Sequence, residues 1–257
     1  MFATVECRDA PRGFGGFIKD IFTLPEITVQ KVKIPFGDWF YRVVSTEYRG
    51  QIPVEETAEK LKRLKKSVIF EIDFPTDERT RELEFEPSEF MAMLIFNSAT
   101  EYIIRLELEP LSSSVVLYDP EGFYINRIKA LVPLFSKIMV YTKNTAVYSE
   151  TVKELMDEYG LSLVVSDTLP GKAPDSTAAI CYGEVPFSNF FNGILFTDNE
   201  NVPPCACCIR GYGIDLPGEY ELLRPKGIGQ LYFAAALYEK GGVKSLGELS
   251  FKKMRLT

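Results

Sequence analysis

One stretch of the sequence, residues 114–167, limits the fold more than any other because it repeats a single pattern. Short apolar runs at residues 114–119, 137–142 and 161–166 each end in a polar side chain. Between them, apolar residues recur at helical spacing: Ile125, Ile128, Leu131, Val132 and Phe135 in the first interval, and Val152, Leu155, Met156 and Tyr159 in the second. The pattern predicts strand, helix, strand, helix, strand.

The strands of this stretch are apolar at successive positions, which is typical of a parallel sheet covered on both faces. Two more short strands, at residues 178–182 and 193–197, and a last helix at residues 227–240 continue the series. We therefore expect an α/β fold in which residues 110–257 form a doubly wound parallel-sheet domain with right-handed crossovers.

Residues 1–109 are expected to form a separate mixed-sheet α/β domain. β-branched and aromatic residues favour strands at residues 3–7, 27–34, 39–46 and 67–73, and a helix is predicted to begin at Pro53. Residues 75–86 alternate in charge and are expected to form a mobile or partner-facing loop. Residues 88–108 are expected to form one long helix, because a strand at residues 102–108 would leave too few residues for a parallel crossover.

Charge limits the partners of the chain. Its 257 residues carry a formal net charge of -7, so a nucleic acid or an anionic membrane would meet net repulsion. A local basic cluster alternates with glutamates on the predicted helix and is interpreted as a solvated face: Lys60, Lys62, Arg63, Lys65 and Lys66. We expect neither a nucleic acid nor a membrane as partner.

The chain contains no histidine, which removes catalytic triads, zinc-water sites and proton shuttles that depend on imidazole. Its five cysteines are an odd number, which favours a reducing compartment over a disulfide scaffold. No run of apolar residues is long enough for a spanning helix or a signal peptide. A cytoplasmic protein is expected.

Two short motifs leave alternatives open. The glycine-rich run at residues 12–17 could cradle an anion with its backbone amides and Arg12, or could be a simple connection. The thiols of Cys205, Cys207 and Cys208 could bind a soft metal, with Cys181 or Cys7 as a fourth ligand, or could pack as small apolar residues in a core strand. The spacing is tighter than that of a zinc knuckle, so core packing is favoured and no metal is expected.

In the order of its strands and helices, the segment at residues 114–197 resembles the Rossmann-like NAD(P)-binding superfamily. Its layout is similar to that of the cofactor half of shikimate-dehydrogenase-like enzymes, in which a separate α/β half precedes the nucleotide-binding half. The resemblance implies a ligand site at the carboxyl ends of the strands, near the point where strand order reverses. The candidate cleft residues at the predicted strand ends are Asp119, Gly122, Lys143, Asn144, Asp167 and Gly183.

The first turn departs from the pattern of that superfamily. A dinucleotide fingerprint needs three glycines, whereas residues 119–123 contain Gly122 alone, together with Asp119 and Glu121. Both carboxylates would lie where phosphates belong, so the pocket is expected to be filled by the charge of the protein itself. Lys143 lies where NADP-preferring members carry a cation for the 2′-phosphate, although a lysine at a strand end is also ordinary surface chemistry.

The leading hypothesis for function is a ligand-binding or non-catalytic protein, related to dinucleotide-binding enzymes but without their phosphate loop, and with no cofactor. Any small-molecule ligand is expected in the cleft between the two halves. The alternative is an NADP-dependent oxidoreductase with an unusual phosphate turn, which would use Lys143 for the cofactor and a tyrosine or lysine for proton transfer. Tyr212, Asp215 and Lys226 are acid-base candidates, but nothing in the sequence directs them to the cleft. A metal protein built on the cysteine cluster is the third hypothesis.

Overall fold

The computed structural model describes residues 1–9 and 25–256, and these residues form two compact units. The first unit comprises Met1–Ser88 and Asp215–Leu246, and the second comprises Glu89–Ile214 and Gly247–Thr257. The glycine-rich run at residues 12–17 lies outside the described residues. None of the helices in the described part of the chain has the length and apolar character that a bilayer crossing requires.

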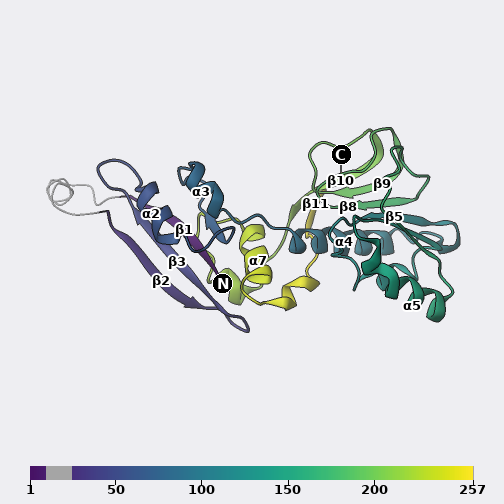
Figure 1. Cartoon of the computed structure of the whole chain (residues 1–257), viewed down its shortest axis with the longest axis horizontal. Helices are drawn as coiled ribbons and strands as arrows, with labels where there is room; N and C mark the ends of the chain where they lie inside the picture. The colour runs from purple at the N-terminus through teal and green to yellow at the C-terminus, as the bar shows by residue number, and fades with distance from the viewer. Residues whose placement is uncertain (10–24, 257) are drawn as a thin grey trace. The chain divides into compact units, whose positions relative to one another are not determined.

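The first unit is a four-stranded mixed sheet with helices around it, as expected for the N-terminal part (Figure 1). The strand order is β2-β3-β1-β4, in which β1 runs parallel to β3 and β4 while β2 is antiparallel to β3. Its elements are β1 (Phe2–Arg8), β2 (Ile27–Lys33), β3 (Trp39–Thr46), α2 (Val54–Leu61), β4 (Val68–Phe70), α3 (Glu78–Leu83), α6 (Gly218–Glu221) and α7 (Gln230–Glu239).

Apolar side chains cover both faces of this sheet. On one face, Val5 and Val43 belong to a core cluster with Leu61 of α2 and Leu83 of α3. Another cluster joins Phe2 and Phe40 to Phe233 of α7, with ring centroids 5.1 Å apart for the stacked pair and 5.7 Å from Phe40 to Phe233. Helix α7 comes after the parallel-sheet segment in the sequence. The mixed sheet is therefore completed by a helix that is far from its strands along the chain.

The charged segment at residues 75–86 is not the loop that its composition predicts. Its centre is the short helix α3, which begins at Asp77 with a reciprocal capping box: the Asp77 carboxylate accepts from Thr80 N at 2.9 Å, and Thr80 Oγ1 accepts from Asp77 N at 2.8 Å. Leu83 and Phe85 are buried and hold the segment against the sheet. The loop prediction is wrong because it relied on the charged composition of the segment. The capping box and the two buried apolar side chains stabilise a helix there instead.

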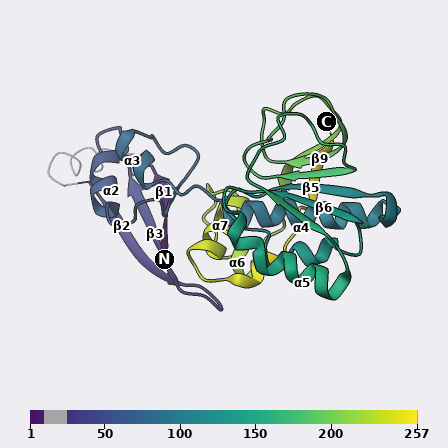
Figure 2. The same cartoon turned by 45° about the vertical axis from the view of Figure 1, so that its right-hand side comes forward.

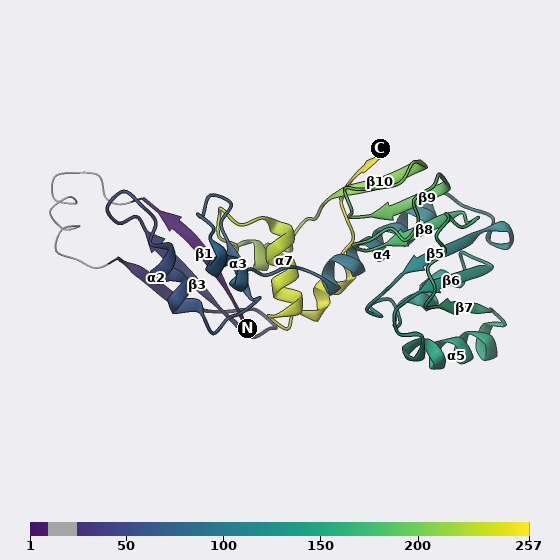
Figure 3. The same cartoon turned by 45° about the horizontal axis from the view of Figure 1, so that its top comes forward.

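The second unit contains a seven-stranded sheet of order β11-β10-β9-β8-β5-β6-β7, in which the six strands from β10 to β7 are parallel. Figure 3 shows these strands side by side in this order. Its strands and α-helices are α4 (Glu89–Arg105), β5 (Ser114–Tyr118), β6 (Lys137–Tyr141), α5 (Ser149–Tyr159), β7 (Leu163–Ser166), β8 (Ala178–Cys181), β9 (Phe191–Thr197), β10 (Cys205–Gly213) and the antiparallel β11 (Lys253–Leu256). The 3₁₀ helices of the described chain are η1 (Pro110–Ser112), η2 (Ile128–Leu131), η3 (Thr145–Tyr148) and η4 (Lys244–Glu248).

Counted from β5, the six parallel strands follow the order 3-2-1-4-5-6, which is that of the doubly wound dinucleotide-binding fold. The predicted fold class, a mixed α/β part followed by a Rossmann-like parallel sheet, is thus confirmed. Figure 2 shows α4 and α5 on one side of this sheet. The other face is covered by loop residues that pack on Val116, Tyr141 and Leu195: Ala173, Val185, Phe187 and Val202.

Two intervals of the second unit show how well spacing predicts a helix. Helix α5 lies where it is expected and ends at Gly160, whose φ of 64° is the left-handed conformation that favours glycine. The interval at residues 125–135 has the same spacing but forms turns and the 3₁₀ helix η2. Its apolar residues Ile128, Leu131 and Phe135 are buried as expected, but Pro133 cannot donate the helical hydrogen bond.

The division between the units differs from the one expected at residue 109. The chain passes from one unit to the other after Ser88, Ile214 and Leu246. Helix α4 therefore groups with the parallel sheet, where it contacts β8 and β9, and α7 groups with the mixed sheet. Local sequence patterns predict both helices but carry no information on which sheet each one covers.

Candidate functional site

The candidate site is the edge of the second unit where the strand order reverses, between β5 and its neighbour β8. In open α/β sheets, ligands bind outside the carboxyl ends of the strands at such a point. All six residues predicted for the cleft directly follow, or lie shortly after, the carboxyl ends of β5, β6, β7 and β8: Asp119, Gly122, Lys143, Asn144, Asp167 and Gly183.

The carboxylate of Asp119 fills the turn after β5. Its Oδ1 accepts from the amides of Gly122 at 3.0 Å and Phe123 at 2.8 Å, and its Oδ2 accepts from the amide of Tyr124 at 2.9 Å. Gly122 has a φ of 83°, so the turn takes the left-handed conformation there. Successive amides that converge in this way form an anion-binding concavity. In this chain the anion is a side chain of the same turn.

A fourth donor reaches the same carboxylate from another element. The hydroxyl of Tyr148, at the end of η3, donates a hydrogen bond to Asp119 Oδ2. Asp119 is only 1% exposed and Tyr148 is fully buried. Burial raises the pKa of Asp119, while the Tyr148 hydroxyl and the three amides act in the opposite direction by stabilising the charged form. Because all four partners donate, the geometry suits the ionised carboxylate.

Glu121 does not share this role. Its side chain is exposed, and its Oε1 lies 3.9 Å from the Nζ of Lys143 after β6. The expectation that both acids occupy the phosphate position is therefore wrong for Glu121. The same contact places Lys143, the candidate for a 2′-phosphate, beside a carboxylate of the neighbouring turn.

Gly183, after β8, is held by two residues that the sequence analysis did not name. Its amide donates to Asp198 Oδ1 at 2.8 Å, and its carbonyl accepts from Asn199 Nδ2 at 2.6 Å. Asp198 and Asn199 directly follow β9, so the rule that polar residues at strand ends mark the site would have identified them. Burial raises the pKa of Asp198, against the effect of the Gly183 amide.

Two side-chain contacts join the end of β5 and the turn after it to the turn after β8. The rings of Phe123 and Tyr182 meet edge to face with centroids 6.2 Å apart. The hydroxyl of Tyr118 lies 3.2 Å from Glu184 Oε2 and donates to it. The crevice that would receive a ligand in this fold is therefore bridged by contacts within the chain.

Tyr124 ends the same turn and places its side chain in the interior of the second unit. The residue is fully buried, and its ring packs against Phe96 of α4 at a centroid distance of 5.1 Å. Among the described residues, its hydroxyl has no hydrogen-bond partner. Burial raises the pKa of Tyr124 well above its ordinary value, and the nearby carboxylate of Asp119 adds to this effect.

The remaining predicted residues are on the surface. Asn144 is exposed, and its amide donates to Thr142 Oγ1 at 3.3 Å. Asp167 is exposed and accepts from the hydroxyl of the adjacent Thr168. Asp215 and Lys226, two of the three acid-base candidates, are exposed residues of the other unit, and the side chain of the third, Tyr212, lies outside the described part of the chain. None of the four exposed residues makes a described contact with the Asp119 turn.

The cysteine cluster lies on β10, where two of its three residues contribute to the core. Cys208 is buried in the cluster on the loop-covered face together with Cys181, and Cys205 packs against it. Burial and the neighbouring thiols raise the pKa of Cys205 to about 11. In the part of the chain that the structure describes, no group of three or more cysteine, aspartate or glutamate side chains is placed to hold a metal ion.

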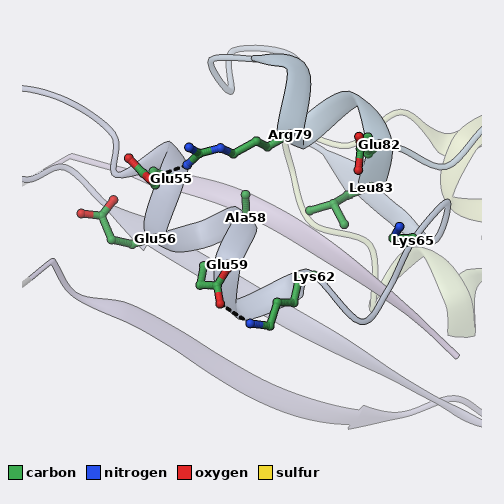
Figure 4. Close-up of a pocket in the computed structure, with 9 residues that line it drawn as sticks. All are labelled: Glu55, Glu56, Ala58, Glu59, Lys62, Lys65, Arg79, Glu82 and Leu83. Atoms are coloured by element: carbon green, nitrogen blue, oxygen red, sulfur yellow. Dashed lines mark hydrogen bonds and ion pairs between the residues drawn. The ribbon is translucent and has the colours of Figure 1, made fainter.

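A hollow of about 720 Å³ lies in the first unit, between α2 and α3. Figure 4 shows its lining, in which Arg79 pairs with Glu55 and Lys62 pairs with Glu59. These pairs are solvent-exposed, and its apolar lining is limited to Ala58 and Leu83. The basic cluster predicted to be a solvated face contributes Lys62 and Lys65 to this exposed surface, in which three cations lie among four glutamates.

Comparison with known proteins gives little more. No protein-family model and no curated protein matches this chain. A solved structure, that of L-tryptophan dehydrogenase from Nostoc punctiforme, is similar with 11% sequence identity and a TM-score of 0.32, over 91% of this chain and 71% of that chain. A TM-score this low carries no argument about ligand or activity.

Proposed function

We propose that this chain is a Rossmann-like protein without a dinucleotide site, with a ligand-binding or non-catalytic role rather than the role of a dehydrogenase. The observation that carries the proposal is the position of the Asp119 carboxylate, which accepts the three amides of the turn after β5. In dinucleotide-binding domains these amides and the following helix bind the pyrophosphate.

A pyrophosphate could enter this turn only by displacing a buried carboxylate. Displacement would break four hydrogen bonds to Asp119 and bring further negative charge beside it. Hydrogen bonds to a charged group contribute roughly 1.5–3 kcal/mol each. The loss of several such bonds to Asp119 would therefore cost more free energy than one contact with a phosphate would return. The amides serve the fold and are not available to a cofactor.

Titration with NADP and NAD, followed by thermal unfolding, tests this proposal. We expect no change in Tm with either nucleotide. A ligand present at a hundred times its dissociation constant stabilises the folded state by about 2.7 kcal/mol, which corresponds to a rise in Tm of about 5–10 °C for a chain of this size. A rise of that kind would contradict the proposal.

The alternative, an NADP-dependent oxidoreductase, is favoured by one observation: Lys143 lies beside the turn after β5, since Glu121 of that turn is its ion-pair partner. Under this alternative, NADP raises Tm and NAD does not, and the substitution Lys143→Ala removes the difference. Lys172 is a surface lysine after β7, so Lys172→Ala serves as the matched control. If both nucleotides leave Tm unchanged in all three proteins, the oxidoreductase alternative is discarded.

A further inference from the structure

The turn between β2 and β3 holds a bulky aromatic residue in a conformation that L-residues rarely adopt. Phe36 has a φ of 57° and follows Pro35, and the amide of Gly37 donates to the carbonyl of Ile34 at 3.2 Å. Proline followed by a residue of positive φ is the arrangement of a type II turn, in which glycine normally occupies the position of Phe36. Bulky residues with such strain concentrate at functional positions.

The turn is nevertheless held firmly in place. A Cβ atom on Gly37 would lie 2.6 Å from the carbonyl oxygen of Gly241, so the two segments are in close contact. Asp38 N donates to the same carbonyl at 2.8 Å, and Lys33 Nζ donates to Gly37 O at 2.8 Å. On this fixed support the side chain of Phe36 is 90% exposed. Figure 2 shows the hairpin extending past the amino-terminal end of β1.

Two lysines lie over the exposed ring of Trp39. Trp39 is 39% exposed, and the Nζ atoms of Lys31 and Lys33 lie 4.7 and 5.1 Å from its ring centroid. We refer to Lys31, Lys33, Phe36 and Trp39 as the tip surface. Residues 31–39 carry these two lysines and a single acid, Asp38, in a chain whose net charge is -7.

We propose that the tip surface binds an anionic lipid bilayer, with Phe36 inserted below the headgroups. Interfacial anchors combine aromatic side chains with lysines, whose ammonium groups bind lipid phosphates. The net charge of the chain opposes such a partner, but residues 31–39 themselves carry two lysines and one acid. At physiological salt, charges more than about 8 Å apart are largely screened from one another.

The shape of the tip surface favours a bilayer over an acidic protein. Both would attract the lysines, but a protein would also need a pocket to receive the protruding ring of Phe36. A bilayer has an apolar interior below every point of its surface, so it can receive the ring of Phe36 without a preformed pocket. With one deeply inserting side chain, the binding is weak, reversible and dependent on salt.

Trp39 is the single tryptophan of the chain, so its fluorescence reports on the tip surface alone. The test adds the full chain to vesicles of phosphatidylcholine, with or without about 30% phosphatidylserine, an anionic content that gives a negative surface potential. We expect the emission of Trp39 to shift to shorter wavelength with the anionic vesicles only, and the shift to disappear at about 0.5 M salt, at which the screening length falls to a few ångströms.

Phe36→Gly is the informative variant because glycine suits this position of the turn and therefore preserves the hairpin. It is expected to lower the partition coefficient by about tenfold to a hundredfold. Lys31→Gln and Lys33→Gln are each expected to lower it by about fivefold. The matched control is Ile72→Ala, which removes a side chain that is 87% exposed beyond the opposite end of the same sheet and should leave binding unchanged.

Three results would overturn the proposal: no change in Trp39 emission with anionic vesicles, equal binding to uncharged vesicles, or equal binding by the Phe36→Gly variant. If no vesicle changes the emission of Trp39, the tip surface is better explained as a contact for a protein partner with a pocket for Phe36. The far-ultraviolet circular dichroism of each variant shows whether it is folded, so a failure to bind is not confused with a failure to fold.

Discussion

The hydroxyl of Tyr148 donates a hydrogen bond to the carboxylate of Asp119, and both side chains are buried at the point where the parallel sheet reverses its strand order. The pair joins the turn after β5 to the start of α5. A contact of this kind ties two crossover connections together beneath the edge of the sheet at which related folds bind ligands.

Asp119→Asn should lower the free energy of unfolding by about 2–4 kcal/mol, because an amide group cannot accept from all four donors and leaves buried N–H groups unpaired. Urea denaturation measures the change. Glu121→Gln, in the same turn but exposed, is the control and should change stability by less than about 0.5 kcal/mol. Equal effects of the two substitutions would show that the Asp119 carboxylate is not what holds the turn.

Tyr148→Phe should lower the free energy of unfolding by about 1.5–3 kcal/mol, the contribution of a hydrogen bond to a charged group. Tyr159→Phe, at the exposed end of α5, is the matched control and is expected to be neutral. In the double variant with Asp119→Asn, the loss of unfolding free energy should be smaller than the sum of the losses in the two single variants, because the two residues share one hydrogen bond. Strict additivity would argue against a direct bond.

Tyr124→Phe should have the opposite effect from Tyr148→Phe. The Tyr124 hydroxyl is buried without a partner among the described residues, so its removal should leave stability unchanged or raise it by about 1 kcal/mol. Thermal unfolding of the two variants, measured side by side, makes the comparison. A clear loss of stability in Tyr124→Phe would instead reveal an internal water bound to the hydroxyl.

The half-buried thiol of Cys205 should react slowly with iodoacetamide at pH 8. Burial raises its pKa to about 11, well above the ordinary range of a cysteine thiol. Since only the thiolate reacts, alkylation at pH 8 should be about a hundredfold slower than for an unperturbed cysteine, and should accelerate about tenfold for each pH unit until pH 11. Mass mapping of the labelled peptide measures the rate. Rapid labelling at pH 7 would indicate a reactive thiol and contradict the assignment to the core.

Local pattern was enough to predict most elements of the parallel sheet. The run before Asp119 and the helix that ends at Gly160 are both defined by neighbouring residues, and both are found where expected. Pro133 interrupts the one helical pattern that failed, and the capping box of Asp77 and Thr80 was hidden within a charged segment. In each of these two cases, one local hydrogen-bonding feature outweighed composition.

The candidate site was predictable only in part. Asp119 could be identified from the missing glycines, because a carboxylate that follows a strand can bond to the amides of its own turn. Tyr148 could not, since it is 29 residues away and reaches Asp119 only through tertiary packing. Glu121 and Lys143 show the same limit, because the sequence predicts their positions at strand ends but not that they pair with each other.

The route of the chain also matters for how the protein can be divided. Strand β11 pairs antiparallel with β10, yet the chain leaves the second unit after Ile214 and returns only at Gly247. A single cut therefore cannot release either unit intact. During synthesis, the edge of β10 stays unpaired until residues 253–256 have been made, so the seven-stranded sheet is completed only after both segments of the first unit have emerged.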